Sequence, residues 1–222
     1  MSNVNSFSIS KIMRNLRKHR SIFHSEADFQ HALAWQIHTD FPDCQIRLEY
    51  KPISSVNMSV DIWVWIGDIQ IAIEVKYPAA KHIIKRQDLF ETFHLDKGGP
   101  LNTARYGFLK DIQRLEQFAG RRDTLCFAVL LTNQRRLWEV PQRGWKHEND
   151  YQFRIHQKQW VNGHKTWAPK TSQKTKQSHP PLDIKGRYVM EWQNYSSFRD
   201  VTKNSQFRYL AVKIYGNRRR RD

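Results

Sequence analysis

The sequence has little cysteine and no long apolar run. Its two cysteines, Cys44 and Cys126, exclude a disulfide framework and any zinc module built from several cysteines. The longest uninterrupted apolar run, Leu125–Leu131, has seven residues, whereas a membrane-spanning helix needs about 20. The N-terminal residues lack the apolar core of a signal peptide, and the segment around Lys11–Arg20 is basic. We therefore expect an intracellular protein of the reducing cytoplasm that is not embedded in a membrane.

Several catalytic signatures are also missing. The chain has no CxxC or HExxH pattern and no GxxxxGKS/T phosphate-binding loop, which argues against a zinc site of these types and an ATPase of its own. His24, His31 and His38 recur every seven residues, but neighbours at that spacing on a helix are about 10.5 Å apart, too far for one metal ion. Cys126 lies within the apolar run, so we expect a structural residue rather than a nucleophile.

Acidic residues are scarce relative to basic ones, and the imbalance is uneven. The 222 residues contain 37 Lys and Arg against 21 Asp and Glu, a net charge of +16. Residues 1–150 carry 21 basic and 17 acidic side chains, whereas 151–222 carry 16 and 4. Such a basic region predicts a polyanionic partner. Nucleic acid fits better than an anionic membrane, because no strongly amphipathic segment accompanies the charge. The alternative is that these residues only solubilise the surface.

The aromatic content and the spacing of apolar residues indicate a folded chain with several helices. There are 12 Phe, 8 Tyr and 8 Trp, which is more aromatic bulk than a wholly disordered chain carries. Ser25 followed by Asp28 is typical of a helix N-terminus, and apolar residues at a spacing of four then predict a helix over 25–38. Further helices are expected over 9–20, near 84–94, and over Ala104–Ala119 with Gly120 at its end.

Alternating apolar residues predict most strands, and one strand is apolar throughout. Leu125–Thr132 is expected to lie at the centre of a sheet, buried on both faces. The polar, lysine-containing segment 168–182 is expected to be a mobile loop or linker. We expect two parts, a core over 1–145 and a basic extension over 146–222. The remaining strands are expected at 45–50, 60–66, 69–76, 137–140, 187–192 and 207–215.

The segment 60–76 carries the most specific pattern in the chain. Gly67-Asp68 separates two alternating strands and predicts a two-residue type II′ turn, which pairs Ile66 with Ile69. Side chains alternate between the two faces of such a hairpin. One face consists entirely of Val and Ile, so we expect it to pack against the core.

The same register brings two carboxylates together on the other face. It places Asp61 opposite Glu74, with Cβ atoms roughly 5 Å apart, and Lys76 lies one pleat further along. Two like charges in this position are destabilising unless a cation lies between them, and a divalent metal ion with oxygen ligands is the natural occupant. The alternative is that each carboxylate is an ordinary surface residue paired with a cation such as Lys76.

This pattern resembles that of the PD-(D/E)xK nuclease superfamily, which has the restriction-endonuclease-like fold. The matching residues are Asp61 and, 13 positions later, Glu74-Val75-Lys76. The resemblance covers about residues 22–140, with a helix, a three-strand meander, a crossover helix and a buried strand. It departs at Val60, where the name of the motif has proline. It implies an α/β (α+β) fold with a mixed central sheet flanked by helices, here with a basic C-terminal elaboration.

The resemblance also implies a metal site and roles for its residues. Asp61, Glu74 and the backbone carbonyl of Val75 would bind Mg²⁺, for which Mn²⁺ is expected to substitute, and the metal would activate water against a phosphodiester. Lys76 would orient that water or stabilise charge on the phosphate. Glu26, in the first turn of the preceding helix, would hold a second metal ion or a metal-bound water, as acidic residues there do in branches of the superfamily. The alternative is that Glu26 only stabilises the helix N-terminus.

Basic residues after the hairpin and at the C-terminus are candidates for nucleic-acid contacts. The alternative for each of them is a solvated charge on the surface. Aromatic residues between cations in 151–167 suit stacking on bases, and they suit a small β-rich elaboration equally well. The candidate cations are Arg105, Lys110, Arg114, Arg121, Arg122, Arg218, Arg219, Arg220 and Arg221.

These observations favour a Mg²⁺-dependent endonuclease that acts on DNA, in restriction, antiviral defence or repair, and they leave an RNA substrate open. Two alternatives stay open: a structure-specific nuclease such as a Holliday-junction resolvase, and a nucleic-acid-binding protein without catalysis. The first predicts a compact dimer and fits the basic extension less well. The second is disfavoured by the presence of Asp61, Glu74 and Lys76 together. A homodimer or a complex with a separate regulatory or ATPase subunit is compatible with the sequence.

Overall fold

The computed structural model describes residues 7–52, 58–96, 98–121, 123–142, 145–198 and 204–216, with the backbone alone at 87 and 145. Two helices precede a group of strands, and a third helix leads into a long buried strand. In chain order the elements are α1 (Ile9–His19), α2 (Glu26–Asp40), β1 (Gln45–Tyr50), β2 (Val60–Ile66), β3 (Ile69–Lys76), β4 (His82–Arg86), η2 (Gln87–Leu89), β5 (Glu91–Leu95), α3 (Leu101–Leu115), β6 (Thr124–Thr132), α4 (Arg135–Trp138), η3 (Trp145–His147), η4 (Tyr151–Phe153), β7 (Trp160–Lys165), α5 (Gln173–Ser178), β8 (Leu182–Val189), β9 (Trp192–Ser197) and β10 (Gln206–Ile214).

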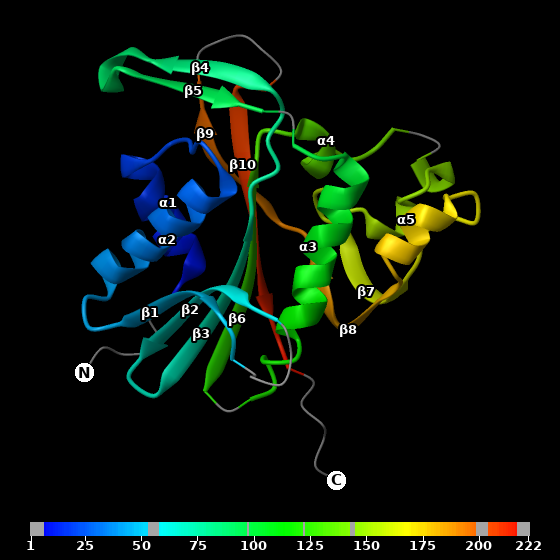
Figure 1. The fold of residues 1–222 in the computed structure, drawn as a ribbon, viewed down its shortest axis with the longest axis horizontal. Coiled ribbons are helices and arrows are strands. Elements are labelled where there is room, and N and C mark those ends of the chain that lie inside the picture. The colour runs from blue at the N-terminus through cyan, green and yellow to red at the C-terminus, as the bar shows by residue number, and fades with distance from the viewer. Residues whose placement is uncertain are drawn as a thin grey trace.

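Six strands form the central sheet, in the order β1-β2-β3-β6-β10-β9 (Figure 1). β3 and β6 run parallel and the other neighbouring pairs are antiparallel, so the sheet is mixed. β6 lies inside the sheet, as its continuous apolar sequence predicts, and its residues from Cys126 to Thr132 are buried. Two small antiparallel sheets, β4-β5 and β7-β8, lie outside the central one.

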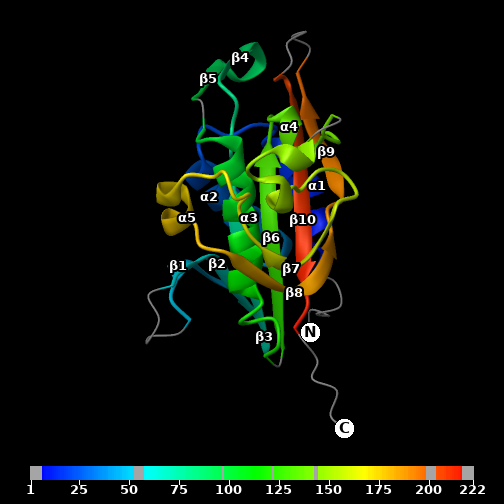
Figure 2. The same ribbon diagram turned by 90° about the vertical axis from the view of Figure 1, so that its right-hand side faces the viewer.

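Helices cover both faces of the central sheet (Figures 1 and 2). The Val and Ile face of the β2-β3 hairpin packs with α1 and α2 in one apolar cluster from Ile62 onward, whereas Val60, predicted on the same face, lies in a second cluster. The opposite face carries Trp63 and Ala72, which pack with α3 in that second cluster. Trp63 is 2% exposed. The face that carries Asp61 and Glu74 is therefore covered by α3 and is not an open solvent face.

Two local sequence signals are confirmed, at the start of α2 and at the turn of the hairpin. Ser25 Oγ accepts a hydrogen bond from the backbone N–H of Asp28 at 3.1 Å, as a helix N-cap does. Gly67 has a φ of 56°, in the region that favours glycine, and Ile66 pairs with Ile69. Both the helix start and the strand register thus follow from short sequence patterns.

The segment near 84–94, predicted as a helix, instead forms the β4-β5 hairpin. Ile84 and Phe93 pair across the two strands and are both buried. Apolar residues here include the adjacent pairs Ile83-Ile84 and Leu89-Phe90, so the segment is too short and irregular to distinguish a strand period from a helical one. A contact with a distant part of the chain supports the strand, since the ring of His24 stacks on Phe93 at 4.3 Å between centroids.

Three other element predictions differ from the structure. The strand predicted over 187–192 spans the end of β8 and the start of β9. The strand predicted over 137–140 is wrong, because Leu137 and Trp138 belong to the short helix α4 and are both buried. Two adjacent apolar residues do not define a period, so the pattern was ambiguous. The helix predicted over 104–119 is α3, but it ends at Leu115, and Gly120 therefore does not terminate it.

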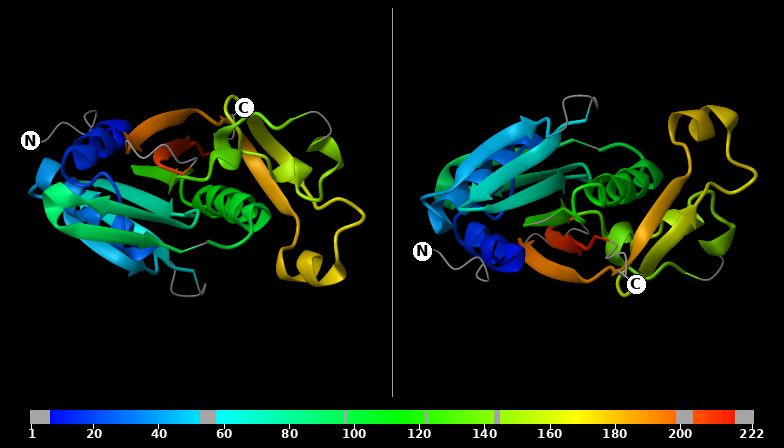
Figure 3. Two further views of the ribbon diagram at one scale, coloured as in Figure 1. Left: turned by 90° about the horizontal axis from the view of Figure 1, so that it is seen from above. Right: turned by 90° about the horizontal axis from the view of Figure 1, so that it is seen from below.

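The C-terminal residues divide between the central sheet and a small lobe. β9 and β10 complete the central sheet, so the boundary predicted between 145 and 146 separates strands of one sheet. The segment 168–182, predicted as a loop or linker, contains the helix α5, where Ser172 Oγ accepts a hydrogen bond from the N–H of Thr175 at 3.3 Å. Figure 3 shows α5, β7 and β8 in a lobe beside α3.

Both cysteines are buried free thiols. Burial raises the pKa of Cys126 to about 12, which agrees with a structural residue rather than a nucleophile. Within the described ranges, no helix is long and apolar enough to cross a membrane.

Candidate active site

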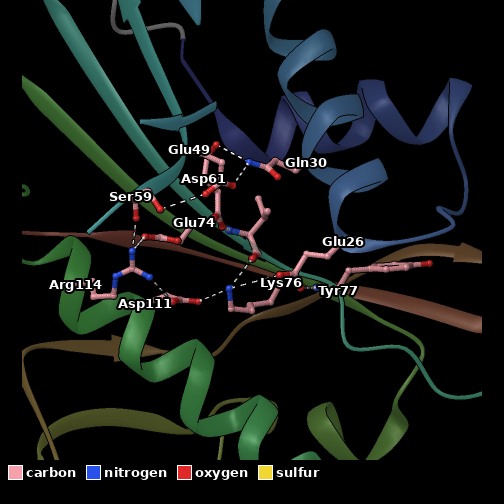
Figure 4. Close-up of polar contacts among 11 residues, drawn as sticks. Glu26, Gln30, Glu49, Ser59, Asp61, Glu74, Lys76, Tyr77, Asp111 and Arg114 are labelled. Carbon is pink, nitrogen blue, oxygen red and sulfur yellow. Dashed lines mark hydrogen bonds and ion pairs between the residues drawn. The ribbon is translucent and has the colours of Figure 1, made fainter. Parts of the chain in front are cut away.

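The candidate site forms where β2 and β3 lose their regular pairing. The ladder between the strands is regular as far as Ile62 and Ile73. At the next residue of β2, a side chain replaces the backbone as the hydrogen-bond acceptor. Asp61 Oδ2 accepts a hydrogen bond from the N–H of Val75 at 2.7 Å. Asp61 and Glu74 lie near each other at this end of the hairpin (Figure 4).

Glu74 is an almost completely buried carboxylate, with 1% exposure. Among the described residues, no donor forms a hydrogen bond with either of its oxygens. Its ion pair is with Arg114, whose Nη2 lies 3.1 Å from Oε1. Burial, followed by the charges of Asp111 and Asp61, raises the pKa of Glu74 to about 9, and the neighbouring cations offset only part of this rise. A further cation that reaches Glu74 favours its ionised form and so opposes this rise in pKa.

Lys76 ends β3 and is held among acidic side chains. Its Nζ lies 3.3 Å from Asp111 Oδ2 and 3.7 Å from Glu26 Oε1, and it donates to the carbonyl of Val75 at 3.1 Å. Burial lowers the pKa of Lys76, but Asp111, Glu26 and the two hairpin carboxylates raise it by more, so the net shift is upward. The side chain is therefore an ammonium at neutral pH.

Helix α2 contributes two residues to the site. Glu26, the first residue of the helix, accepts a hydrogen bond from the N–H of Tyr77 through Oε2 at 2.7 Å. Its carboxylate thus lies at the end of β3, beside the lysine of the hairpin. One turn later, Gln30 Nε2 donates to the carbonyl of Asp61 at 2.6 Å and to Glu49 Oε1 at 2.9 Å. These contacts hold the first turns of α2 against the carboxylate end of the hairpin.

Asp111 on α3 belongs to the site, although it is not among the residues predicted from the sequence. It is 3% exposed and bridges two cations, with Oδ2 toward Lys76 and with Oδ1 3.5 Å from Arg114 Nη1. Burial raises the pKa of Asp111 to about 6, against the lowering effect of both cations. The available signal was a lone carboxylate among the apolar residues of the helix, between Phe108 and Leu115.

Glu49 is a second acidic residue that the sequence analysis missed. It lies in β1 with a φ of 51°, which is uncommon for a residue other than glycine. Its carboxylate accepts hydrogen bonds from Gln30 and from Ser59 Oγ, the latter at 3.2 Å. No sequence signal distinguishes Glu49, because it occupies an ordinary position in an alternating strand.

The residues present fit a hard divalent cation that retains water ligands. Within the described ranges, no group of three or more His, Cys, Asp or Glu side chains is arranged to hold a metal ion. Mg²⁺ does not require such a group, because it keeps several waters and is commonly held by one or two carboxylates. Asp61, Glu74 and the carbonyl of Val75 supply a set of this kind, and the oxygens of Glu74 that lack hydrogen bonds leave acceptor capacity for it.

The structure removes one residue from the candidate nucleic-acid contacts. Arg105 is buried, forms an ion pair with Asp150 and donates to the carbonyl of Arg136 at 2.9 Å. A guanidinium with these contacts is not presented to a phosphate. Arg105 instead joins α3 to the segment that follows β6, which is a structural role.

The other candidate cations differ in their accessibility. Lys110 and Arg121 are exposed, and the guanidinium of Arg121 lies 5.1 Å from the ring centroid of Phe118. Arg114 is half-buried within the site itself. Arg122 and Arg218–Arg221 lie outside the described residues.

The aromatic residues proposed for base stacking include both buried and exposed side chains. Phe153 and Trp167 are buried in the second apolar cluster together with Tyr106. Trp160 is 49% exposed, and the guanidinium of Arg187 lies 4.3 Å from its ring centroid. An exposed indole beside a cation suits stacking on a base, so Trp160 is the residue on which this hypothesis now rests.

Comparisons with protein-family models, with curated proteins and with solved structures found no match to this chain. Its function is therefore inferred from the arrangement of its own residues. That arrangement consists of two hairpin carboxylates, an ammonium between acidic side chains, and an arginine against the buried glutamate.

Proposed function

We propose that the chain is a Mg²⁺-dependent nuclease that hydrolyses phosphodiester bonds of DNA, built on a restriction-endonuclease-like core. The observation that carries the proposal is the buried carboxylate of Glu74, which lacks hydrogen bonds and lies near Asp61 at the end of a hairpin. Neighbouring carboxylates are stabilised in a protein interior when a cation binds them. Lys76, at the end of the same strand, adds the ammonium that stabilises charge on a phosphate.

The order of the elements supports the proposed fold. α2, β1, β2, β3, α3 and β6 form a helix, a three-strand meander, a crossover helix and a strand parallel to β3, with the β4-β5 hairpin inserted after the meander. This is the succession that the resemblance implies for residues 22–140. α3 covers the face that bears the carboxylates, and so it brings Asp111 and Arg114 to them.

In this proposal, Asp61, Glu74 and a backbone carbonyl of β3 would hold Mg²⁺, which when bound polarises the scissile phosphate and acidifies a water. Lys76 stabilises the negative charge that develops on the phosphate oxygens. Asp111 and Glu26 set the position of its ammonium, from 3.3 and 3.7 Å. Because these carboxylates also raise the pKa of Lys76, the side chain acts as a hydrogen-bond donor and not as a base.

The charge of the chain supports a nucleic-acid substrate. The net charge is +16, and Lys110, Arg121 and Trp160 are accessible for backbone and base contacts. DNA is proposed over RNA on the resemblance alone.

Cleavage of supercoiled plasmid tests this function. Wild-type protein is incubated with Mg²⁺, with Mn²⁺ or with EDTA, beside Asp61→Asn and a matched control. The control is Asp68→Asn, which removes the same charge from the exposed turn of the same hairpin. We expect metal-dependent cutting by the wild type and by Asp68→Asn, no cutting by Asp61→Asn, and DNA binding by all three. Equal cutting by Asp61→Asn, or no metal-dependent cutting by the wild type, contradicts the proposal.

A further inference from the structure

Arg114 is a partly exposed residue of the site that contacts its buried carboxylates. Its guanidinium contacts three acceptors: Glu74 Oε1 at 3.1 Å, Asp111 Oδ1 at 3.5 Å and the backbone carbonyl of Ser59. The Arg114 side chain is 25% exposed, whereas those of Glu74 and Asp111 are 1% and 4% exposed. Figure 4 shows the guanidinium between Ser59 and the two carboxylates.

The guanidinium touches the carboxylate that the proposed metal ion needs. In the part of the chain that the structure describes, Glu74 accepts no hydrogen bond, and the cation in contact with it is Arg114. A divalent ion bound to the same carboxylate would lie within several ångströms of the guanidinium. Two positive groups repel strongly at such a distance in a buried site. The metal ion and Arg114 in its present position therefore compete for Glu74.

We propose that Arg114 is a displaceable counter-ion of Glu74, and that a nucleic-acid phosphate takes the guanidinium when a divalent cation takes the carboxylate. This inference rests on the proposed function and adds a substrate-binding residue to it. A guanidinium exchanges carboxylate for phosphate readily, because its planar fork of donors suits both anions. Partial exposure of the side chain gives it access to the solvent side, where a phosphate would arrive.

Asp111 allows this exchange without leaving Lys76 unpaired. Its two oxygens contact different cations, Oδ2 facing Lys76 and Oδ1 facing Arg114. When Arg114 turns outward, Asp111 keeps its contact with the ammonium. Metal binding and nucleic-acid binding should then strengthen each other, and by thermodynamic linkage each does so by the same factor.

Binding of Mn²⁺ to the metal-free protein, followed by the EPR signal of free Mn²⁺, tests the competition without any reaction. The variant is Arg114→Gln, and the control is Lys110→Gln, which removes the same charge from an exposed position one turn earlier in α3. We expect Arg114→Gln to bind Mn²⁺ at least about fivefold more tightly than the wild type, the low end of typical coupling between sites. Lys110→Gln should resemble the wild type. An affinity of Arg114→Gln equal to or below that of Lys110→Gln overturns the inference.

A second measurement uses the wild type and remains decisive if Arg114→Gln does not fold. The Mn²⁺ affinity of the wild type is measured with and without a phosphorothioate DNA duplex, which resists hydrolysis. We expect the duplex to tighten Mn²⁺ binding at least about fivefold. A Mn²⁺ affinity that does not respond to the duplex overturns the inference.

The outcomes separate this inference from the proposed function. If the wild type binds no Mn²⁺ either alone or with the duplex, or if Asp61→Asn binds it equally well, the metal site is absent and both fail. If Mn²⁺ binds through Asp61 but responds neither to Arg114→Gln nor to the duplex, only the exchange fails.

Discussion

Replacement of Glu74 by glutamine is predicted to stabilise the metal-free protein while abolishing catalysis. The carboxylate is 1% exposed, and its surroundings raise its pKa from 4.5 to about 9. The folded protein therefore holds the proton of this group more tightly than the unfolded chain does. The associated stability is fully present below pH 4.5 and is lost as the pH rises through about 9.

The magnitude follows from the size of this shift. Each pH unit between the unfolded and the folded pKa costs the native state about 1.4 kcal/mol. At pH 7 the ionisable carboxyl therefore costs up to about 3 kcal/mol relative to a neutral group of the same shape. Glutamine is such a group. The gain from Glu74→Gln should fall below about 1 kcal/mol near pH 5 and should increase toward pH 9.

Urea unfolding in EDTA at about pH 5, 7 and 8.5 measures the difference in the free energy of unfolding. The control is Glu139→Gln, which removes the same charge from an exposed position. We expect Glu74→Gln to be clearly more stable than the wild type at the highest pH and nearly equal to it at the lowest, and we expect no such trend for Glu139→Gln. A Glu74→Gln variant that is less stable than the wild type at every pH would show that Arg114 fully compensates the carboxylate, and the reasoning would be refuted.

Three further predictions concern other residues. Lys76→Gln should abolish Mg²⁺-dependent plasmid cleavage and leave DNA affinity in a gel-shift assay close to wild type, and cleavage at the wild-type rate would contradict its role. Arg105→Gln should lower the free energy of unfolding in urea by about 3 kcal/mol, the low end for breaking a buried ion pair, because Asp150 loses one buried partner but keeps Arg154. Unchanged stability with a selective loss of DNA affinity would contradict this prediction. Trp160→Ala should weaken single-stranded DNA binding, measured by fluorescence anisotropy, by about 1–3 kcal/mol. Trp35→Ala, which removes another indole that is 74% exposed, should not weaken it, and equal losses would rule out a specific stacking site.

The buried carboxyl groups of the site lower the stability of the metal-free fold, and retention of such groups agrees with a functional role. Burial raises the pKa values of both Glu74 and Asp111 above their ordinary range, and the charge of Asp61 adds to both shifts. Groups perturbed in this way cluster at functional sites, where they are tuned for ligands or chemistry. A core of neutral residues between α3 and the hairpin would avoid the penalty.

The hairpin is the part of the candidate site that can be predicted from sequence, because its signals are local. A two-residue turn sets the register, and a side-chain period of two decides the face. This register predicts Asp61, Glu74 and Lys76 on one face without any knowledge of the rest of the chain, and the observed ladder follows it as far as Ile62 and Ile73. The start of α2 is equally local, since the N-cap at Ser25 places Glu26 in the first turn.

Short apolar segments are where sequence reasoning failed. The residues of β4 and β5 fit a helix as well as a strand over so few positions, and the pairing of Ile84 with Phe93 decides between them. Leu137 and Trp138 present the same ambiguity in α4. Contacts with other elements decide whether such a segment becomes a helix or a strand, and the local sequence pattern does not specify those contacts.

Local sequence patterns indicate which charges share a strand face, whereas the burial of those charges depends on how the whole chain packs. Asp111 and Arg114 reach Glu74 across 37 and 40 positions of the chain, because α3 covers the carboxylate face of the hairpin. Arg105 and Lys110 are similar basic residues of the same helix, yet the first is buried against an acidic partner and the second is exposed. A tight turn and the side-chain period of two depend on residues that are neighbours in the chain. The burial of a side chain depends instead on which distant segments pack against it.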